Sequence, residues 1–163
     1  MSEKLQKHIG RVLAESGTLA AIATLDESGA PFSVPSPFLK QDESGMLVHL
    51  ELLETSSTHR NLLRSIWFDR PVSVTLSGRE KEVLVISGRP HKALVSGLYF
   101  TACYREVRSL MGDVDLAAVW LIEPLQIRDE TYLIRKLQEE ALHPFYQHLD
   151  RLVILQDSEF VRK

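Results

Sequence analysis

Two cationic side chains stand at the start of a predicted helix, where an anion would be favoured. Residues 54–61 read Glu-Thr-Ser-Ser-Thr-His-Arg-Asn, so acidic and hydroxyl residues lead directly into His59 and Arg60. Ser and Thr are preferred N-cap residues, and a helix N-terminus carries about half a positive charge, which makes two cations mildly unfavourable there without a negative partner. Backbone N–H groups, the hydroxyls of Ser57 and Thr58 and the Arg60 guanidinium would together form a phosphate cradle. The alternative is an ordinary N-cap followed by surface charges.

Two prolines interrupt a segment that otherwise reads as a strand. Pro35 and Pro37 lie within residues 30–39, and each lacks the backbone N–H that strand pairing requires. Because they are two positions apart, one edge of the strand loses both donors. The pattern predicts either an edge beside a ligand or an ordinary edge strand protected against aggregation.

Polar side chains share one face of each of two further predicted strands. His49 and Glu51 alternate with apolar residues over residues 46–53. The same alternation places three hydroxyl residues on one side of residues 72–77, namely Ser73, Thr75 and Ser77. Each row either lines a ligand groove or faces water.

Neither a metal site nor a nucleophile motif is expected. His143 and His148 are five positions apart with Pro144 between them, a spacing that does not bring two ligands onto one helical face. Cys103 has no neighbour in sequence that would activate a thiolate, so we expect it in the core. Gly-x-Ser-x-Gly, Gly-rich dinucleotide and Walker motifs are absent from the sequence. No catalytic acid or base can be identified from it.

These candidates fall on a mainly β pattern of six short strands in antiparallel hairpins, with helices inserted late and at the ends, as in a small β-barrel with peripheral helices. Strands are predicted over residues 18–25, 30–39, 46–53, 72–77, 83–91 and 116–128. Helices are predicted over the opening stretch to Gly17, after residues 55–58, over 95–111, and over 131–149 with a bend at Pro144.

Length and composition fit one globular domain over residues 1–163, since 44% of the residues are hydrophobic and the formal net charge is −3. A single cysteine excludes an internal disulfide and a multi-cysteine zinc site. With 19 basic against 22 acidic residues, no global positive field attracts nucleic acid. The apolar runs are too short to span a membrane, and the opening residues lack the apolar stretch of a signal peptide. We therefore expect a cytoplasmic protein that binds neither nucleic acid nor a membrane.

The order and spacing of several motifs resemble those of the pyridoxamine 5′-phosphate oxidase-like FMN-binding split barrels. The matching segments are residues 19–26 with Gly29, and residues 31–35, 57–62, 70–74, 86–90 and 119–124. The resemblance covers about residues 18–130, and residues 131–163 form a predicted C-terminal helical extension. It implies a six-stranded antiparallel split β-barrel that forms a homodimer with two FMN molecules at the subunit interface.

The resemblance also implies which residues bind FMN. The phosphate would be held by the start of the second predicted helix, and the isoalloxazine ring would lie along the proline-containing strand. The implied cofactor-binding residues are Pro35, Ser36, Pro37, Phe38, His49, Leu50, Glu51, Ser57, Thr58, His59, Arg60 and Ser77.

The function expected from this resemblance is that of an FMN-dependent oxidoreductase acting on a small-molecule substrate or electron donor. Two alternatives stay open. Residues 59–62 and 120–124 are also similar to the haem-utilisation branch of these barrels. In a haem protein, the axial ligand would be one of His49, His59, His91, His143 and His148. The other alternative is a flavin-binding module without turnover, since fold does not fix function.

Overall fold

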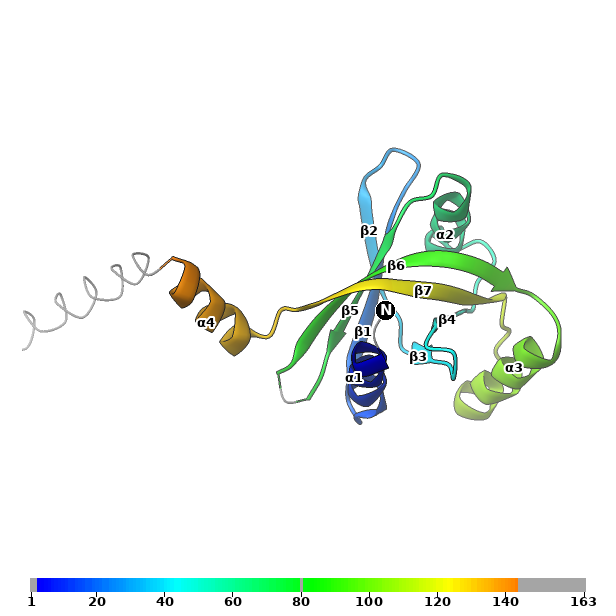
Figure 1. Cartoon of the computed structure of the whole chain (residues 1–163). Coiled ribbons are helices and arrows are strands. Elements are labelled where there is room, and N and C mark those ends of the chain that lie inside the picture. The colour runs from blue at the N-terminus through cyan, green and yellow to red at the C-terminus, as the bar shows by residue number, and fades with distance from the viewer. Residues whose placement is uncertain (1–2, 80, 144–163) are drawn as a thin grey trace, which may run out of the picture.

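One antiparallel sheet forms the body of the molecule (Figure 1). The computed structural model describes residues 3–79 and 81–143. Its strands lie in the order β2-β1-β5-β6-β7-β4-β3. The strands are β1 (Leu19–Leu25), β2 (Pro31–Pro35), β3 (Lys40–Gln41), β4 (Leu47–Glu51), β5 (Val72–Ser77), β6 (Val83–Leu94) and β7 (Ala118–Asp129). The helices are α1 (Glu3–Ala14), α2 (Ser57–Trp67), α3 (Leu98–Met111) and α4 (Tyr132–Leu142). The predicted mainly β class with peripheral helices is confirmed.

The sheet has seven strands in the described residues, where the sequence predicted six. The additional strand is β3, whose two residues pair with the start of β4. The sequence predicted only a turn there. The Asp42 carboxylate does close that turn, accepting hydrogen bonds from the N–H groups of Ser44 and Met46 at 2.9 Å each. Residues within the turn determine its conformation, whereas the short pairing of β3 depends on the position of β4.

The proline-containing strand is an edge strand, as its missing donors indicated, because β2 pairs with β1 alone. It ends at Pro35, so the prediction of a continuous strand over residues 30–39 is wrong. The Ser36 N–H donates to the Ala20 carbonyl at 2.8 Å, and the Ser36 carbonyl accepts the N–H three residues later at 3.1 Å. Pro37 therefore lies in a turn, where its fixed φ and missing donor carry no penalty.

The two longest strands, β6 and β7, curl the sheet into a half-barrel (Figure 1). Their pairing shifts register between Ser87 and Gly88 and again between Pro90 and Lys92, and such bulges bend a strand and increase its twist. Gly88 also permits a close approach, because a Cβ there would lie 2.7 Å from Ile122 Cγ2. The curl turns the apolar faces of distant strands toward one interior.

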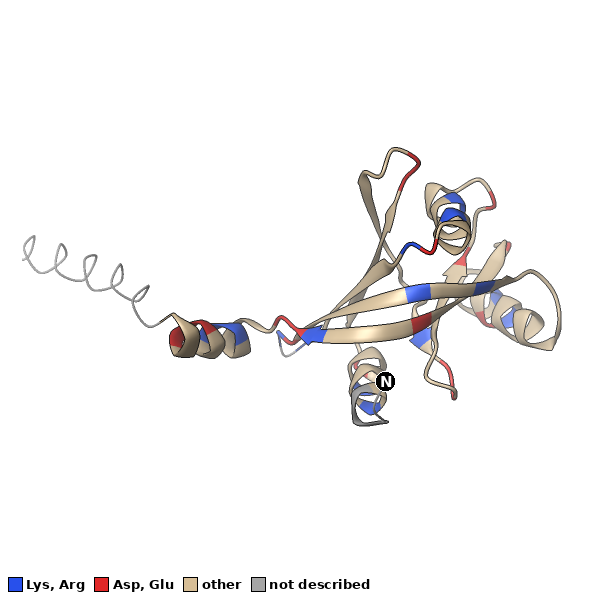
Figure 2. Ribbon diagram, turned by 45° about the horizontal axis from the view of Figure 1, so that its top comes forward, with Lys and Arg blue, Asp and Glu red and all other residues tan. Residues whose placement is uncertain are grey.

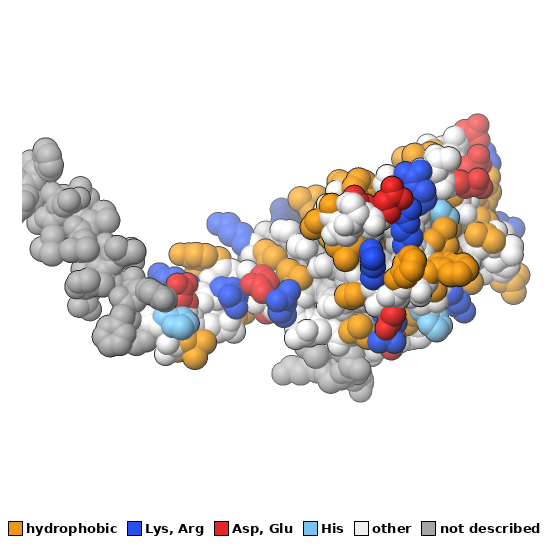
Figure 3. All heavy atoms as spheres, turned by 90° about the horizontal axis from the view of Figure 1, so that it is seen from above, with side chains coloured by type: hydrophobic (Ala, Val, Ile, Leu, Met, Phe, Trp, Pro, Cys, Tyr) orange, Lys and Arg blue, Asp and Glu red, His pale blue; other side chains and the backbone are white. Residues whose placement is uncertain are grey.

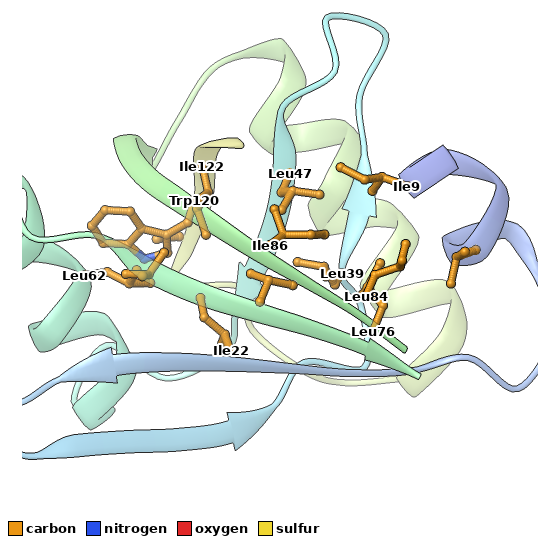
Figure 4. Close-up of a cluster of buried hydrophobic side chains, with 14 residues drawn as sticks. Ile9, Ile22, Leu39, Leu47, Leu62, Leu76, Leu84, Ile86, Trp120 and Ile122 are labelled. Atoms are coloured by element: carbon orange, nitrogen blue, oxygen red, sulfur yellow. The ribbon is translucent and has the colours of Figure 1, made fainter. Parts of the chain in front are cut away.

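Alternating apolar residues fill that interior (Figure 4). In β5, Val72, Val74 and Leu76 are buried while the residues between them are half-buried, as their alternation predicted. Helix α1 adds Ile9 and Val12 to the same cluster. The complete cluster of buried side chains is Ile9, Val12, Ile22, Leu39, Leu47, Leu62, Val72, Val74, Leu76, Leu84, Ile86, Ala118, Trp120 and Ile122.

A second cluster lies under α3 and includes Val48, Leu50, Cys103 and Val107. Cys103 is 1% exposed, which confirms the prediction that it is a core residue. Helix α4, in contrast, extends away from the sheet and buries none of its residues (Figure 1). Its predicted continuation to residue 149 and the bend at Pro144 lie outside the described residues. Within residues 3–79 and 81–143, no helix is long and apolar enough to cross a bilayer.

Candidate functional site

The first turn of α2 is built as the sequence predicted. Ser56 is the N-cap, and its hydroxyl accepts a hydrogen bond from the His59 N–H at 2.9 Å. No acidic residue lies in the first turn, so the partial positive charge of the helix end meets no carboxylate from the helix itself. Arg60 is exposed, and its guanidinium donates to Ser57 Oγ at 3.3 Å. Two hydroxyls, backbone N–H groups and a guanidinium thus gather at one helix end.

A cleft of about 510 Å³ opens beside this helix. It lies between α2 and the β1–β2 hairpin, and its lining residues are Asp26, Glu27, Phe32, Ser57, Arg60, Asn61 and Arg64. Arg60 and Arg64 lie one helical turn apart, so both guanidinium groups face the same opening. Arg64 is paired with Glu27 across the cleft. Figure 2 shows the arginines of α2 in blue, and Figure 3 shows basic side chains gathered beside hydrophobic ones on the face seen from above.

Buried polar contacts hold α2 against the sheet. Asn61 is 2% exposed and donates to Thr24 Oγ1 at 3.0 Å. The Thr24 hydroxyl in turn donates to the Phe32 carbonyl at 3.4 Å. Leu62, on the same helix, enters the core. The helix end and the β1–β2 hairpin are therefore fixed relative to each other, and so is the cleft between them.

A hydrogen bond from a tryptophan of β7 determines which ring nitrogen carries the proton in the histidine of the first turn of α2. The indole N–H of Trp120 donates to His59 Nδ1 at 3.2 Å, and the two rings meet edge to face with centroids 5.5 Å apart. An indole nitrogen is only a donor, so Nδ1 of His59 must be an acceptor and the ring proton is on Nε2. Trp120 itself is fully buried at the α2 end of the core (Figure 4).

A buried chain of polar side chains runs beneath the turn that follows β2. Ser36 Oγ lies 2.7 Å from His49 Nδ1, and His49 Nε2 lies 3.6 Å from Glu51 Oε2. The residues are 1%, 5% and 7% exposed. Burial opposes ionisation of Glu51, but His49, the Ser56 side chain and the Leu53 N–H outweigh it and hold the pKa of Glu51 below its ordinary value. Serine, histidine and a carboxylate in this order also form the catalytic triad of many hydrolases. Ser36, however, is too deeply buried for a substrate to reach it.

Comparison with known proteins supports the fold. No protein-family model matches the chain, and no curated protein matches it in sequence. Among solved structures, HupZ from Group A Streptococcus superposes with a TM-score of 0.61 at 18% identity, covering 81% of this chain and 96% of that one. An FMN-binding protein from Syntrophomonas wolfei gives 0.59 at 11% identity, with coverages of 78% and 90%. The fold is that of the FMN-binding split barrels. An F420 reductase shares it, with a TM-score of 0.55 at 13% identity and coverages of 72% and 94%.

Within this split barrel, the residues expected to bind FMN separate into groups. Ser57 and Arg60 line the cleft. Ser36, His49 and Glu51 form the buried chain, so neither alternative suggested for the polar face of β4, a groove or water, describes it. Four more of the expected residues are Pro35 and Pro37, exposed at the turn; Phe38, packed on the second core cluster; and His59, half-buried against Trp120.

Three of the expected residues lie away from the opening of the split-barrel cleft. Thr58 and Leu50 are each 4% exposed, and Leu50 belongs to the second core cluster. Their side chains therefore pack inside the protein, which leaves only their backbone for a ligand. Ser77 lies at the far end of β5 from the cleft, five residues beyond Val72, or about 17 Å along the strand.

Sequence reasoning missed three functional candidates that the split barrel brings into place. Arg64 could have been found, because it follows Arg60 by four positions on the same helical face. Ser56 belongs to the hydroxyl run but was not singled out as the cap. Trp120 gave no signal, since its contact with His59 spans 61 positions in the chain.

Proposed function

We propose that this split barrel binds FMN in the cleft beside α2. The observation that carries the proposal is the convergence of Ser57, Arg60 and the acid-free first turn of α2 on one cleft of about 510 Å³. A phosphate monoester fits this donor set, because it supplies the negative charge that the helix end and the guanidinium both favour. The FMN-binding protein that shares the fold supports the choice of ligand.

In this proposal the chain's own residues bind and orient the cofactor. Arg60 and the Ser57 hydroxyl hold the phosphate, together with free N–H groups of α2. Phe32 lines the same cleft and offers an aromatic surface, and the turn beginning at Ser36 carries the ring system. FMN supplies electron or hydride transfer when bound, while the protein contributes position and electrostatics.

We further propose that the protein is an oxidoreductase acting on a small molecule. The F420 reductase with the same fold supports this class of activity. The test is consumption of NADH or NADPH by FMN-loaded protein, with a dye as electron acceptor. Turnover would support an enzyme. Retention of FMN without reduction by either donor, and without oxidation of chemically reduced protein by the dye, would instead support a flavin-binding module.

We also propose that the protein is a homodimer. Trp67 and Phe68 at the end of α2 are 81% and 66% exposed, which is unusual for such large apolar side chains. Helix α4 buries none of its 11 residues, and a helix of that length is marginal in water without a partner. A second copy that covers such surfaces would bury on the order of 2,000 Å² in total.

Haem remains the second candidate, and the histidines restrict where it could bind. His49 is 5% exposed and lies between Ser36 and Glu51. The ring proton of His59 is on Nε2. To bind iron through Nε2, His59 would have to carry that proton on Nδ1 instead, and Nδ1 could then no longer accept the hydrogen bond from Trp120. His91 and His143 are both exposed, and each lines its own cleft of about 330 Å³. They are therefore better placed for an iron than His49 and His59, and His148 lies outside the described residues.

The deciding experiment is spectroscopic. Purified protein is mixed with FMN or with haemin, dialysed and scanned, and its melting temperature is measured. A retained flavin spectrum and a raised melting temperature with FMN are expected, since ligand at about 100 times its dissociation constant adds roughly 2.7 kcal/mol. A Soret band with haemin and no response to FMN would replace the proposal by the haem alternative. Loss of that band in His91→Ala or in His143→Ala would then identify the ligand.

A further inference from the structure

The buried polar chain joins the two parts of the proposed FMN site. One end is Ser36, which begins the turn after β2 and fixes it to β1 through the Ala20 carbonyl at 2.8 Å. The Ser36 hydroxyl meets His49 Nδ1 at 2.7 Å in a buried environment. A buried hydrogen bond of this kind is costly to leave unmade, so His49 and the turn hold each other in place.

Glu51 is the middle of the chain. Its Oε2 faces His49 Nε2 at 3.6 Å, and its Oε1 accepts the Leu53 N–H at 3.2 Å. The Leu53 carbonyl in turn accepts the Ser56 N–H at 3.1 Å. These groups hold the carboxylate in its charged form despite its burial. A buried charge depends strongly on its partners, so displacement of any one of them is felt by the others.

The other end is the cap of α2. Ser56, which Glu51 reaches through the backbone of Leu53, accepts the His59 N–H on its hydroxyl at 2.9 Å. The Ser56 carbonyl accepts the Arg60 N–H at 3.3 Å. Glu51 therefore orients the residue that sets the first turn of α2, where Ser57 and Arg60 face the cleft.

One atom in this chain is left without a hydrogen bond. His49 Nε2 is buried and has no acceptor or donor within hydrogen-bond distance, and the nearest carboxylate oxygen is 3.6 Å away. A buried polar atom without a partner raises the free energy of the state that contains it. A shift of Glu51 toward His49 by about half an ångström would bring the pair within ordinary hydrogen-bond length, and it would move the contact with the Leu53 N–H at the same time.

We propose that His49 and Glu51 are positioning residues that couple the Ser36 turn to the first turn of α2, so that an anion at α2 and an aromatic ring at the turn bind cooperatively. The binding part of this inference rests on the proposed FMN site. The coupling between the two segments is a property of the protein without any ligand. Each part is therefore tested separately.

The ligand-free test is residue-resolved amide hydrogen exchange. Glu51→Gln keeps the shape of the side chain and removes its charge, and the expected result is about fivefold or more faster exchange of both the Ser36 and the His59 N–H. Ser36→Ala, made at the other end, should also speed exchange at His59. Glu54→Gln is the matched control, because Glu54 is exposed in the same segment. If only the N–H groups beside each substitution change, or if all amides including Val74 in the core change equally, the coupling is wrong.

The ligand test uses riboflavin and inorganic phosphate as separate probes. In the wild type, saturating phosphate should lower the dissociation constant of riboflavin about fivefold or more, a typical coupling between two sites. Glu51→Gln should abolish this gain in affinity, whereas Glu54→Gln should keep it. An equal gain in Glu51→Gln would overturn the role of Glu51. Absence of flavin binding in the wild type would overturn the proposed function and the cooperative binding, whereas the exchange measurements would still decide the coupling itself.

Discussion

Replacement of Arg60 by alanine should weaken binding of FMN much more than binding of riboflavin. The guanidinium lies exposed at the α2 cleft and contacts Ser57 Oγ at 3.3 Å. A surface contact of this type adds little to the fold, so the free energy of unfolding should change by no more than about 0.5 kcal/mol. The substitution therefore tests binding rather than folding.

The magnitude follows from the exposure of the side chain. A hydrogen bond to a charged group contributes about 1.5–3 kcal/mol, and solvent screening places an exposed guanidinium near the lower limit. Since about 1.4 kcal/mol corresponds to a factor of ten, the FMN dissociation constant should rise about tenfold. Riboflavin has no phosphate, so its dissociation constant should be nearly unchanged. The FMN affinity of the wild type should also fall as salt is added, because the contact is screened.

Fluorescence quenching of each flavin by wild type, Arg60→Ala and Arg108→Ala would measure this ratio. Arg108 is an exposed arginine on α3, so its loss controls for a general change in surface charge. Equal weakening of FMN and riboflavin in Arg60→Ala would show that Arg60 only supports the structure. No weakening of either flavin would return the start of α2 to an ordinary capped helix and refute the phosphate site.

Three further predictions follow from other contacts. Trp120→Phe removes the N–H that His59 Nδ1 accepts and should lower the free energy of unfolding by about 1–3 kcal/mol in urea titration; an unchanged midpoint would contradict this bond. Folding lowers the pKa of Glu51 below its ordinary value of 4.5. The charged carboxylate therefore stabilises the folded protein fully at pH values above 4.5, and this stabilisation is lost as the pH falls through the lower pKa of the folded state. In Glu51→Gln, the melting temperature should depend less on pH below about 4.5 than it does in the wild type. Parallel curves of melting temperature against pH for the two proteins would contradict this. Light scattering at low micromolar concentration should give twice 18.5 kDa, and a mass of 18.5 kDa with and without FMN would reject the dimer.

The sequence determined the features that depend on near neighbours. Alternation in Val72, Val74 and Leu76 predicted which face of β5 is buried, and the structure confirms it. The hydroxyl run before His59 predicted where α2 begins, because capping uses side chains only a few positions away. The missing donors of Pro35 and Pro37 predicted a sheet edge. The resemblance of ordered motifs predicted the split-barrel fold, which the solved structures support.

Tertiary structure decided the features that depend on residues distant in the chain. A strand's alternation separates its two faces but does not tell whether a polar face is covered, so the burial of His49 and Glu51 became visible only in the folded sheet. The contact of Trp120 with His59 and the pairing of Arg64 with Glu27 span 61 and 37 positions, respectively. Such contacts depend on strand order, register and curl, which the whole set of packed elements fixes together.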